Sequence, residues 1–106
     1  MSVGVIIEHH VKPGARDAVR AIWEAYLQPA IAANAGHEAY VYMYDVEQPD
    51  VIRAFQQYRD AESAGAFLAT PAYAAYVEAV EELLVGPPTV TLTEVIWTKP
   101  FEPSET

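Results

Sequence analysis

The stretch from Tyr58 to Leu84 constrains the fold of this chain more than any other. It reads as the end of a strand, a short helix, a Thr-Pro restart and a second helix. Asp60 and Thr70 are each placed to cap one of these helices, because a side-chain oxygen there accepts from an unpaired N–H of the first turn. Pro71 follows at the first helical position, where a missing N–H costs nothing. The sequence therefore predicts two consecutive helices that meet at Thr70-Pro71.

The second of these helices has one apolar face that another part of the molecule must cover. Its apolar residues recur at three- and four-residue steps, which places on one stripe Tyr73, Tyr76, Val77, Val80, Leu83 and Leu84. Gly86 permits a left-handed cap after this stripe, and Pro87-Pro88 prevents continuation. We therefore expect the helix to continue through the stripe and to end at Gly86.

The rest of the chain predicts four strands and one further helical region. Strands are expected at residues 3–11, 38–46, 51–58 and 89–98, which are short and rich in β-branched or aromatic residues. An amphipathic helix is expected over residues 15–33, where Pro29 must kink or restart it because proline clashes with the carbonyl four residues before it. Residues 1–99 are expected to form a single domain, and 100–106 an extended or mobile tail.

This order of elements, β-α-β-β-α-β, is that of ferredoxin-like α+β folds, in which helices lie on one face of a four-stranded antiparallel sheet. In the second strand, tyrosines occupy the even positions of residues 39–44, and Ala, Val and Met occupy the odd positions. One of these two rows must lie on the face without helices. Covering it is worth roughly 25 cal/mol per Å² of apolar area. We therefore expect a homodimer packed sheet to sheet.

Composition and charge narrow the classes of function. The formal net charge is −9 with only six Lys and Arg residues, which argues against a nucleic acid or an anionic membrane as partner. The chain has no cysteine, so disulfides, thiolate nucleophiles and Cys-based metal sites are excluded. No apolar run reaches membrane-spanning length, and the N-terminal residues do not resemble a signal peptide. We therefore expect a cytoplasmic protein.

The segment F-L-A-T-P-A-Y-A-A-Y-V-E-A-V, with V-K-P-G after the first strand and A-N-A-G before the second, resembles the antibiotic-biosynthesis monooxygenase (ABM) domain family. The resemblance covers about residues 3–97 and implies a dimeric α/β barrel. Some members, such as quinol monooxygenases, oxidise phenols or quinols with O₂ and without metal, flavin or haem, whereas others degrade haem. For this chain the resemblance implies a small aromatic substrate and no cofactor.

The sequence departs from the family pattern at several positions. Tyr58 stands where members often have Trp, and Phe67 and Ala72 stand where quinol monooxygenase relatives often carry His. The haem-degrading branch has a His iron ligand on the last helix, but residues 73–82 contain none, so haem degradation is not expected. The missing histidines favour a second interpretation, a non-catalytic dimeric barrel that binds a small apolar ligand or acts as an accessory subunit.

His9 and Tyr58 are the candidate catalytic residues. If the odd positions of the first strand face the helices, His9 enters the space between sheet and helices. A neutral imidazole there can take a phenolic proton and leave an electron-rich phenolate able to react with O₂. Tyr58 can hydrogen-bond a substrate oxygen while its ring stacks on an aromatic ligand. The structural alternatives are a hydrogen-bonded histidine at the rim and a tyrosine that packs in the core.

Four further residues are candidates for substrate binding. Trp23 lies on the inner face of the first helix, and Tyr73 and Tyr76 lie on the apolar stripe, where core packing is the alternative role. The two hydroxyls need partners when buried, which suggests a cavity or water nearby. His37 precedes the second strand and either edges the cavity or is solvated. Three scattered histidines without metal-ligand spacing predict no metal site.

Overall fold

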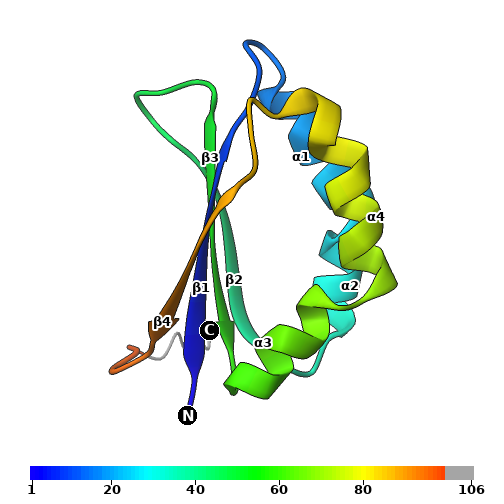
Figure 1. Cartoon of the computed structure of the whole chain (residues 1–106). Coiled ribbons are helices and arrows are strands. Elements are labelled where there is room, and N and C mark those ends of the chain that lie inside the picture. The colour runs from blue at the N-terminus through cyan, green and yellow to red at the C-terminus, as the bar shows by residue number, and fades with distance from the viewer. Residues whose placement is uncertain (100–106) are drawn as a thin grey trace, which may run out of the picture.

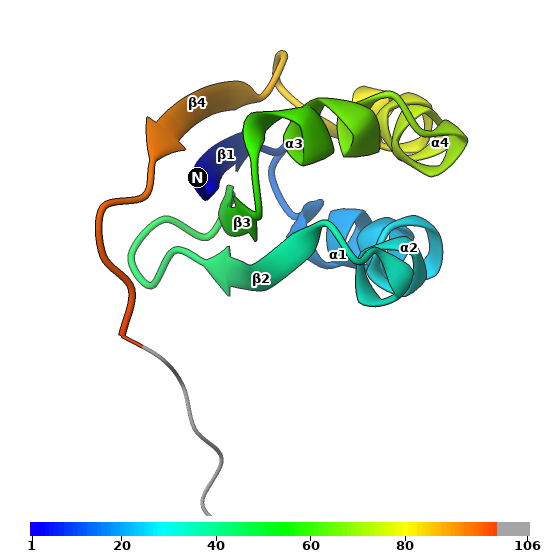
Figure 2. The same cartoon turned by 90° about the horizontal axis from the view of Figure 1, so that it is seen from below.

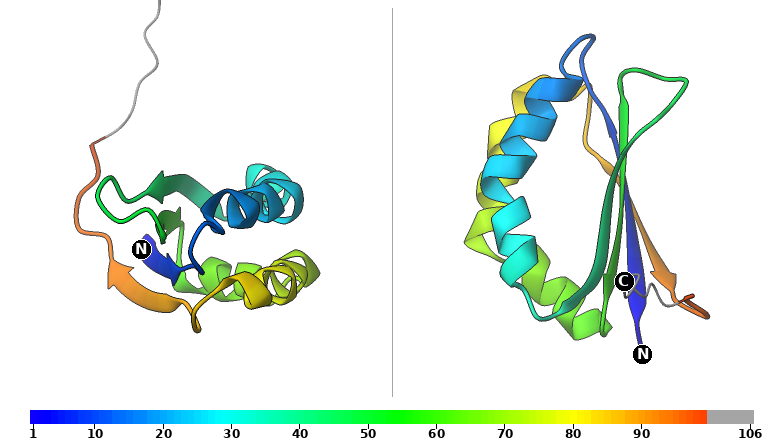
Figure 3. Two further views of the ribbon diagram at one scale, coloured as in Figure 1. Left: turned by 90° about the horizontal axis from the view of Figure 1, so that it is seen from above. Right: turned by 180° about the vertical axis from the view of Figure 1, so that it is seen from behind.

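The computed structural model describes residues 1–99 and confirms the ferredoxin-like α+β fold (Figure 1). The elements in chain order are β1 (Val3–His10), α1 (Arg16–Tyr26), α2 (Gln28–Ala33), β2 (His37–Tyr44), β3 (Val51–Tyr58), α3 (Ala61–Leu68), α4 (Pro71–Val80), the 3₁₀ turn η1 (Glu81–Leu83) and β4 (Thr89–Glu94). The strands pair in the antiparallel order β2-β3-β1-β4. All helices lie on one face of this sheet (Figures 1 and 3). The tail expected at 100–106 lies outside the described residues.

The helix caps that the sequence predicts are present. The Asp60 carboxylate accepts from the backbone N–H of Ser63 at 2.7 Å, and the Thr70 hydroxyl oxygen accepts from the N–H of Tyr73 at 3.3 Å. The Thr70 hydroxyl also donates to the carbonyl of Phe67 at 2.7 Å, which ties the end of α3 to the start of α4. Capping therefore positions the two helices over the sheet, where Figure 2 shows α4 alongside α1 and α2.

The structure selects one of the two alternatives expected at Pro29, and one helix end differs from the sequence-based expectation. The helical region 15–33 is two helices that meet at Leu27, with Pro29 in the first turn of α2, so the proline restarts the helix. Helix α4 ends at Val80, short of the predicted Gly86 cap, because residues 83–85 pair with the end of β1: the N–H of Lys12 donates to the Leu83 carbonyl at 2.8 Å. Within residues 1–99 the only positive φ belongs to Gly14, at 79°.

The fourth strand is shorter than expected. It ends at Glu94, which pairs with Val3, the first residue of β1, and only one further backbone bond is found between the two segments within residues 1–99, from the N–H of Val95 to the Ser2 carbonyl at 3.2 Å. The two large apolar residues that follow, Ile96 and Trp97, are 84% and 77% exposed. Alternation of side chains over residues 89–98 predicted pairing where the neighbouring strand had already ended.

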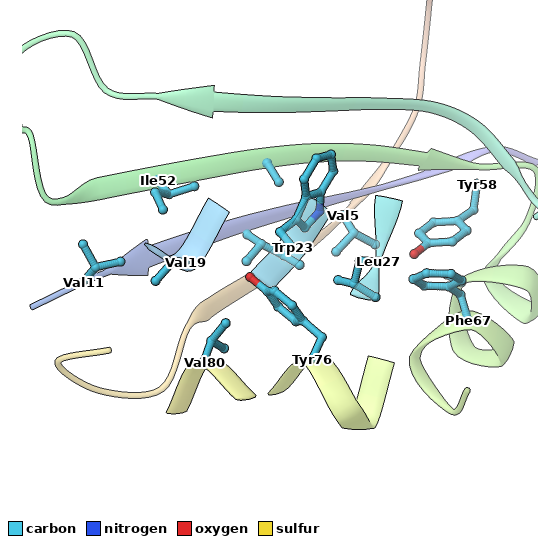
Figure 4. Close-up of a cluster of buried hydrophobic side chains, with 13 residues drawn as sticks. Val5, Val11, Val19, Trp23, Leu27, Ile52, Tyr58, Phe67, Tyr76 and Val80 are labelled. Carbon is cyan, nitrogen blue, oxygen red and sulfur yellow. The ribbon is translucent and has the colours of Figure 1, made fainter. Parts of the chain in front are cut away.

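The tyrosine row of β2 faces the helices, and Ala39, Val41 and Met43 face away from them. Three cross-strand rows make up the inner face of the sheet: Tyr40-Gln56-Val5, Tyr42-Ala54-Ile7 and Tyr44-Ile52-His9. The core lies between these rows and the helices, and Figure 4 shows its labelled side chains converging from both layers. No helix within residues 1–99 is both long and apolar enough to cross a membrane.

Candidate functional site

A cavity of about 360 Å³ lies between the inner face of the sheet and α4. Its lining is mostly aliphatic and aromatic and consists of Ile7, His9, Leu27, Tyr40, Tyr42, Ile52, Ala54, Gln56, Phe67, Tyr73, Tyr76, Val77, Val80, Glu81, Leu84, Gly86, Pro87 and Pro88. Among these residues only Glu81 carries a formal charge at neutral pH, and its side chain is exposed. The cavity therefore suits a neutral, mainly apolar molecule with few hydrogen-bonding groups.

His9 is buried in the wall of this cavity. Its Nε2 atom lies 3.0 Å from the Tyr76 hydroxyl oxygen, and its Nδ1 atom is buried without a hydrogen-bond partner in residues 1–99. Burial lowers the pKa of His9 to about 4, because the charged imidazolium would lose its hydration. The imidazole is therefore neutral at pH 7, with Nε2 hydrogen-bonded to Tyr76 and Nδ1 without a partner among the described residues.

Tyrosine hydroxyls supply most of the remaining polarity of the cavity wall. The Tyr40 hydroxyl accepts from Nε1–H of Trp23 at 3.1 Å, whereas the Tyr42 hydroxyl is buried without a partner among the described residues. Burial raises the pKa of Tyr40 to about 12 and raises the pKa values of Tyr42 and Tyr76 further. All three phenols keep their protons at neutral pH and act as hydrogen-bonding groups, not as bases.

Gln56 is the one carboxamide in the cavity wall, and it is only 2% exposed. Its Oε1 atom accepts from the Tyr58 hydroxyl at 2.5 Å and lies 3.1 Å from Nε2 of His37. Nδ1 of His37 in turn lies 2.8 Å from Nδ2 of Asn34. Figure 4 shows Tyr58 beside Phe67 at one end of the labelled core. A chain of polar side chains therefore supports Gln56 from behind.

The six residues singled out from the sequence fall into two groups. His9, Tyr73 and Tyr76 line the cavity. The other three contact lining residues from behind. Trp23 stacks on Tyr42 with ring centroids 4.3 Å apart, and Tyr58 and His37 are both hydrogen-bonded to Gln56. His37 was expected in the loop before the second strand, but it is the first residue of β2.

Sequence reasoning missed three uncharged polar residues of the wall, namely Gln56, Tyr40 and Tyr42. A signal for Gln56 was present, because it shares its alternation with Ile52 and Ala54 and is therefore a polar residue in an otherwise apolar row. A polar side chain at such a position needs partners inside the fold. For the tyrosines, the sequence left open which row of β2 faces the helices.

Comparison with known proteins places this fold in a family. The family model for antibiotic biosynthesis monooxygenases matches residues 2–79. The structure of Rv0793 from Mycobacterium tuberculosis is 27% identical, with a TM-score of 0.83, and the match covers 94% of this chain and 100% of that one. No curated protein matches the chain.

Two more distant structures share the fold alone. PA3566 from Pseudomonas aeruginosa is 19% identical with a TM-score of 0.79, and the match covers 91% of this chain and 95% of that one. A structure described as an antibiotic biosynthesis monooxygenase is 19% identical with a TM-score of 0.79 and coverages of 89% and 98%. The match of the family model over residues 2–79 confirms the resemblance seen in the sequence, and the chain belongs to the antibiotic biosynthesis monooxygenase family.

Proposed function

We propose that this protein is a cofactor-independent monooxygenase that oxidises a small phenolic or quinol substrate with O₂ in the cavity under α4. The observation that carries the proposal is the buried, neutral His9, which is hydrogen-bonded to Tyr76 and has its second nitrogen unpaired in an aromatic cavity. Membership of a family named for monooxygenases supports the same class of reaction. The substrate is a small aromatic molecule, which matches the largely apolar and aromatic lining, and it carries no phosphate or carboxylate, since the lining residues include no Lys or Arg.

In the proposed reaction His9 carries its proton on Nε2, which donates to the Tyr76 hydroxyl oxygen, and Nδ1 accepts the proton of the substrate hydroxyl. The phenolate then gives electrons to O₂. One oxygen atom bonds to a ring carbon and displaces its hydrogen, and the other leaves as water. Phenol and O₂ thus become quinone and water, with all the electrons supplied by the substrate.

The low pKa of His9 sets a condition on this step. A phenol has a pKa of about 10, so full proton transfer to a base of pKa about 4 is uphill by roughly 8 kcal/mol if the two ions separate. The transfer becomes feasible when imidazolium and phenolate stay in contact, because opposite charges attract strongly in a site of low polarity. Tyr42 lines the same cavity, and its hydroxyl has no partner among the described residues, so we assign it as the donor to the phenolate oxygen.

Oxygen consumption tests the proposal directly. The purified protein is incubated with a panel of naphthols and hydroquinones, and O₂ uptake and the incorporation of ¹⁸O from ¹⁸O₂ are measured. His9→Ala is expected to lower kcat about 100-fold or more, the usual size of a general-base effect. His10→Ala is the matched control, because the next residue of β1 points to the outer face and is exposed. Equal activity in the wild type and His9→Ala would contradict the role of His9.

A second function, binding of a small apolar ligand without catalysis, is favoured by the same low pKa, which makes His9 a weak base. An accessory subunit of another enzyme would need no more than this. Binding of panel compounds without O₂ uptake would support the second function. Turnover that His9→Ala abolishes would exclude it.

We also propose that the protein works as a homodimer packed through the outer face of the sheet. Ile6, Val41 and Met43 lie on this face and are 40%, 47% and 39% exposed. Sedimentation at micromolar concentration is expected to show a dimer. Val41→Asp should dissociate it, because a charge would be buried without a partner. Val46→Asp, at a loop position that is 98% exposed, is the control that should leave the dimer intact. A wild-type monomer would overturn this proposal.

A further inference from the structure

The hydrogen bonds that link Asn34, His37 and Gln56 all run from donor to acceptor in one direction, which is set by a backbone N–H group. The N–H of Gly36 points to Oδ1 of Asn34 at 3.4 Å. A backbone N–H can only donate, so Oδ1 is the acceptor and the other amide atom of Asn34, Nδ2, is the one 2.8 Å from Nδ1 of His37. An amide nitrogen can only donate as well. Nδ1 of His37 therefore accepts and carries no proton.

The direction continues through His37 to Gln56. A neutral imidazole carries one N–H, and burial lowers the pKa of His37, which favours the neutral ring. With Nδ1 accepting, the proton is on Nε2, which donates to Oε1 of Gln56 at 3.1 Å. The Tyr58 hydroxyl donates to the same oxygen at 2.5 Å. Two donors occupy both lone pairs of Oε1, and the carboxamide has only one orientation that satisfies them.

We infer that Gln56 presents its Nε2–H₂ group to the cavity as a fixed hydrogen-bond donor and thereby selects ligands that carry a neutral acceptor, such as a carbonyl oxygen, at that end. The side chain lines the cavity, and its nitrogen has no hydrogen-bond partner in residues 1–99. The inference rests on the proposed function only in taking this cavity as the substrate site. It adds the residue that discriminates between substrates.

The position of Gln56 also separates this donor from His9. Gln56 is four residues from Ile52, the cross-strand neighbour of His9, which corresponds to about 13 Å along β3. Gln56 and His9 therefore contact different ends of one ligand. An acceptor recognised by Gln56 lies remote from the group that contacts His9.

The proton position on His37 is the first test, and it needs neither a variant nor a ligand. Long-range ¹H–¹⁵N spectra of the ligand-free protein at pH 7 distinguish the two neutral tautomers and the charged ring. The Nε2–H tautomer is the expected result. An Nδ1–H tautomer or an imidazolium would overturn the inference, because Gln56 would then have no reason to keep its nitrogen towards the cavity.

A matched pair of probes is the second test. 1-Tetralone and tetralin share a ring skeleton and differ by one carbonyl, and neither has the phenolic hydroxyl that the proposed reaction consumes. The ratio of their dissociation constants in Gln56→Met is expected to shift about ten-fold against the ketone relative to the wild type, since an unpaired buried carbonyl is costly. Gln57→Met, on the outer face of the same strand, should leave the ratio unchanged.

The outcomes separate this inference from the proposed function. An unchanged ratio in Gln56→Met, or a wild type that binds neither probe, would overturn the inference even if phenols are oxidised. A shifted ratio in a protein that oxidises no phenol would leave the inference standing and refute the monooxygenase. Circular dichroism of both variants checks that they fold. If Gln56→Met does not fold, the tautomer of His37 in the wild type decides the inference.

Discussion

The inner and outer faces of the sheet are formed by alternate residues of the same strands, yet they differ in how their polar atoms are surrounded. On the inner face His9 is buried and neutral. On the outer face His10 lies 2.7 Å from Glu8, which also accepts from Arg53 at 2.9 Å, and Arg53 further pairs with Asp45. The inner face shields a few groups from water, whereas the outer face collects charges around exposed apolar side chains.

This difference predicts different energetic weights for similar residues. Ion pairs that remain in water contribute about 0 to 1 kcal/mol each. A polar group that is cut off from water contributes more, because losing its partner or gaining a charge cannot be offset by hydration. Substitutions of equivalent residues on the two faces should therefore have unequal effects, with the larger effect on the inner face.

Acid should destabilise the protein through His9, the buried histidine of the inner face of β1. The folded state holds His9 neutral down to a pKa of about 4, whereas the unfolded chain binds that proton below about pH 6.5. Lowering the pH from 6.5 to 4 therefore favours unfolding, by about 3 kcal/mol in total. Urea unfolding across this range should show the loss, and His9→Gln should remove most of it.

His10→Gln is the control for this prediction and should keep the loss of stability that comes from His9, because His10 lies on the opposite face of β1. The loss of stability in acid that remains in His9→Gln is expected to come from His37, because burial lowers the pKa of that residue as well. Hydrogen bonds from His10 and Arg53 lower the pKa of Glu8, so its stabilising contribution is lost only as the pH falls below about 4.5. An equal change in His9→Gln and His10→Gln would break the contrast between the faces.

Two valines test the same contrast without charge. Val5 on the inner face is fully buried, and Val41 on the outer face is 47% exposed. Val5→Ala should lower the free energy of unfolding by about 2 to 3 kcal/mol, because it removes two buried methyl groups and leaves a cavity. Val41→Ala should cost less than about 0.5 kcal/mol in a monomer.

Protein concentration sharpens this comparison. If a second copy covers the outer face, the loss in Val41→Ala should grow at higher protein concentration, because association stabilises the folded state by mass action. The loss in Val5→Ala should stay constant. Chemical denaturation at two concentrations measures both, and a large loss in Val41→Ala at high dilution would contradict the assignment of Val41 to an open face.

Much of the fold was predictable because its signals are local. Asp60, Thr70 and Pro71 specify helix starts within a few residues of themselves, and alternation in β2 defines two rows whatever surrounds them. The boundaries that sequence reasoning misplaced depend on distant residues. Strand β4 ends where Val3 begins β1, and α4 ends early because residues 83–85 bond to residues 10–12.

The candidate site was predictable in part for the same reason. His9, Tyr73 and Tyr76 stand out by residue type and periodicity, and they line the cavity. The role of Gln56 depends on the direction of hydrogen bonds that begin at Gly36, twenty positions away. Neither composition nor periodicity carries that information, since it arises when β2 and β3 pair.

A single hydrogen bond on the inner face should be worth more than one at the open rim. Tyr40→Phe leaves Nε1–H of Trp23 buried without its acceptor and should cost about 1 to 2 kcal/mol. Tyr44 lies on the same strand as Tyr40, and its hydroxyl makes an exposed hydrogen bond to Asp17. Tyr44→Phe removes this hydrogen bond and should cost less than about 0.5 kcal/mol. Equal losses in urea unfolding would mean that burial does not set the value of these hydrogen bonds.

The smallest expected effect has the opposite sign and lies between those two tyrosines. The Tyr42 hydroxyl is buried without a partner among the described residues, so its removal takes an unsatisfied polar group out of the interior. Tyr42→Phe should leave the ligand-free protein as stable as the wild type, or more stable by up to about 1 kcal/mol. A loss as large as that of Tyr40→Phe would contradict an unpaired hydroxyl. If the same variant binds naphthols more weakly while its melting temperature is unchanged or higher, the hydroxyl serves the ligand and not the fold.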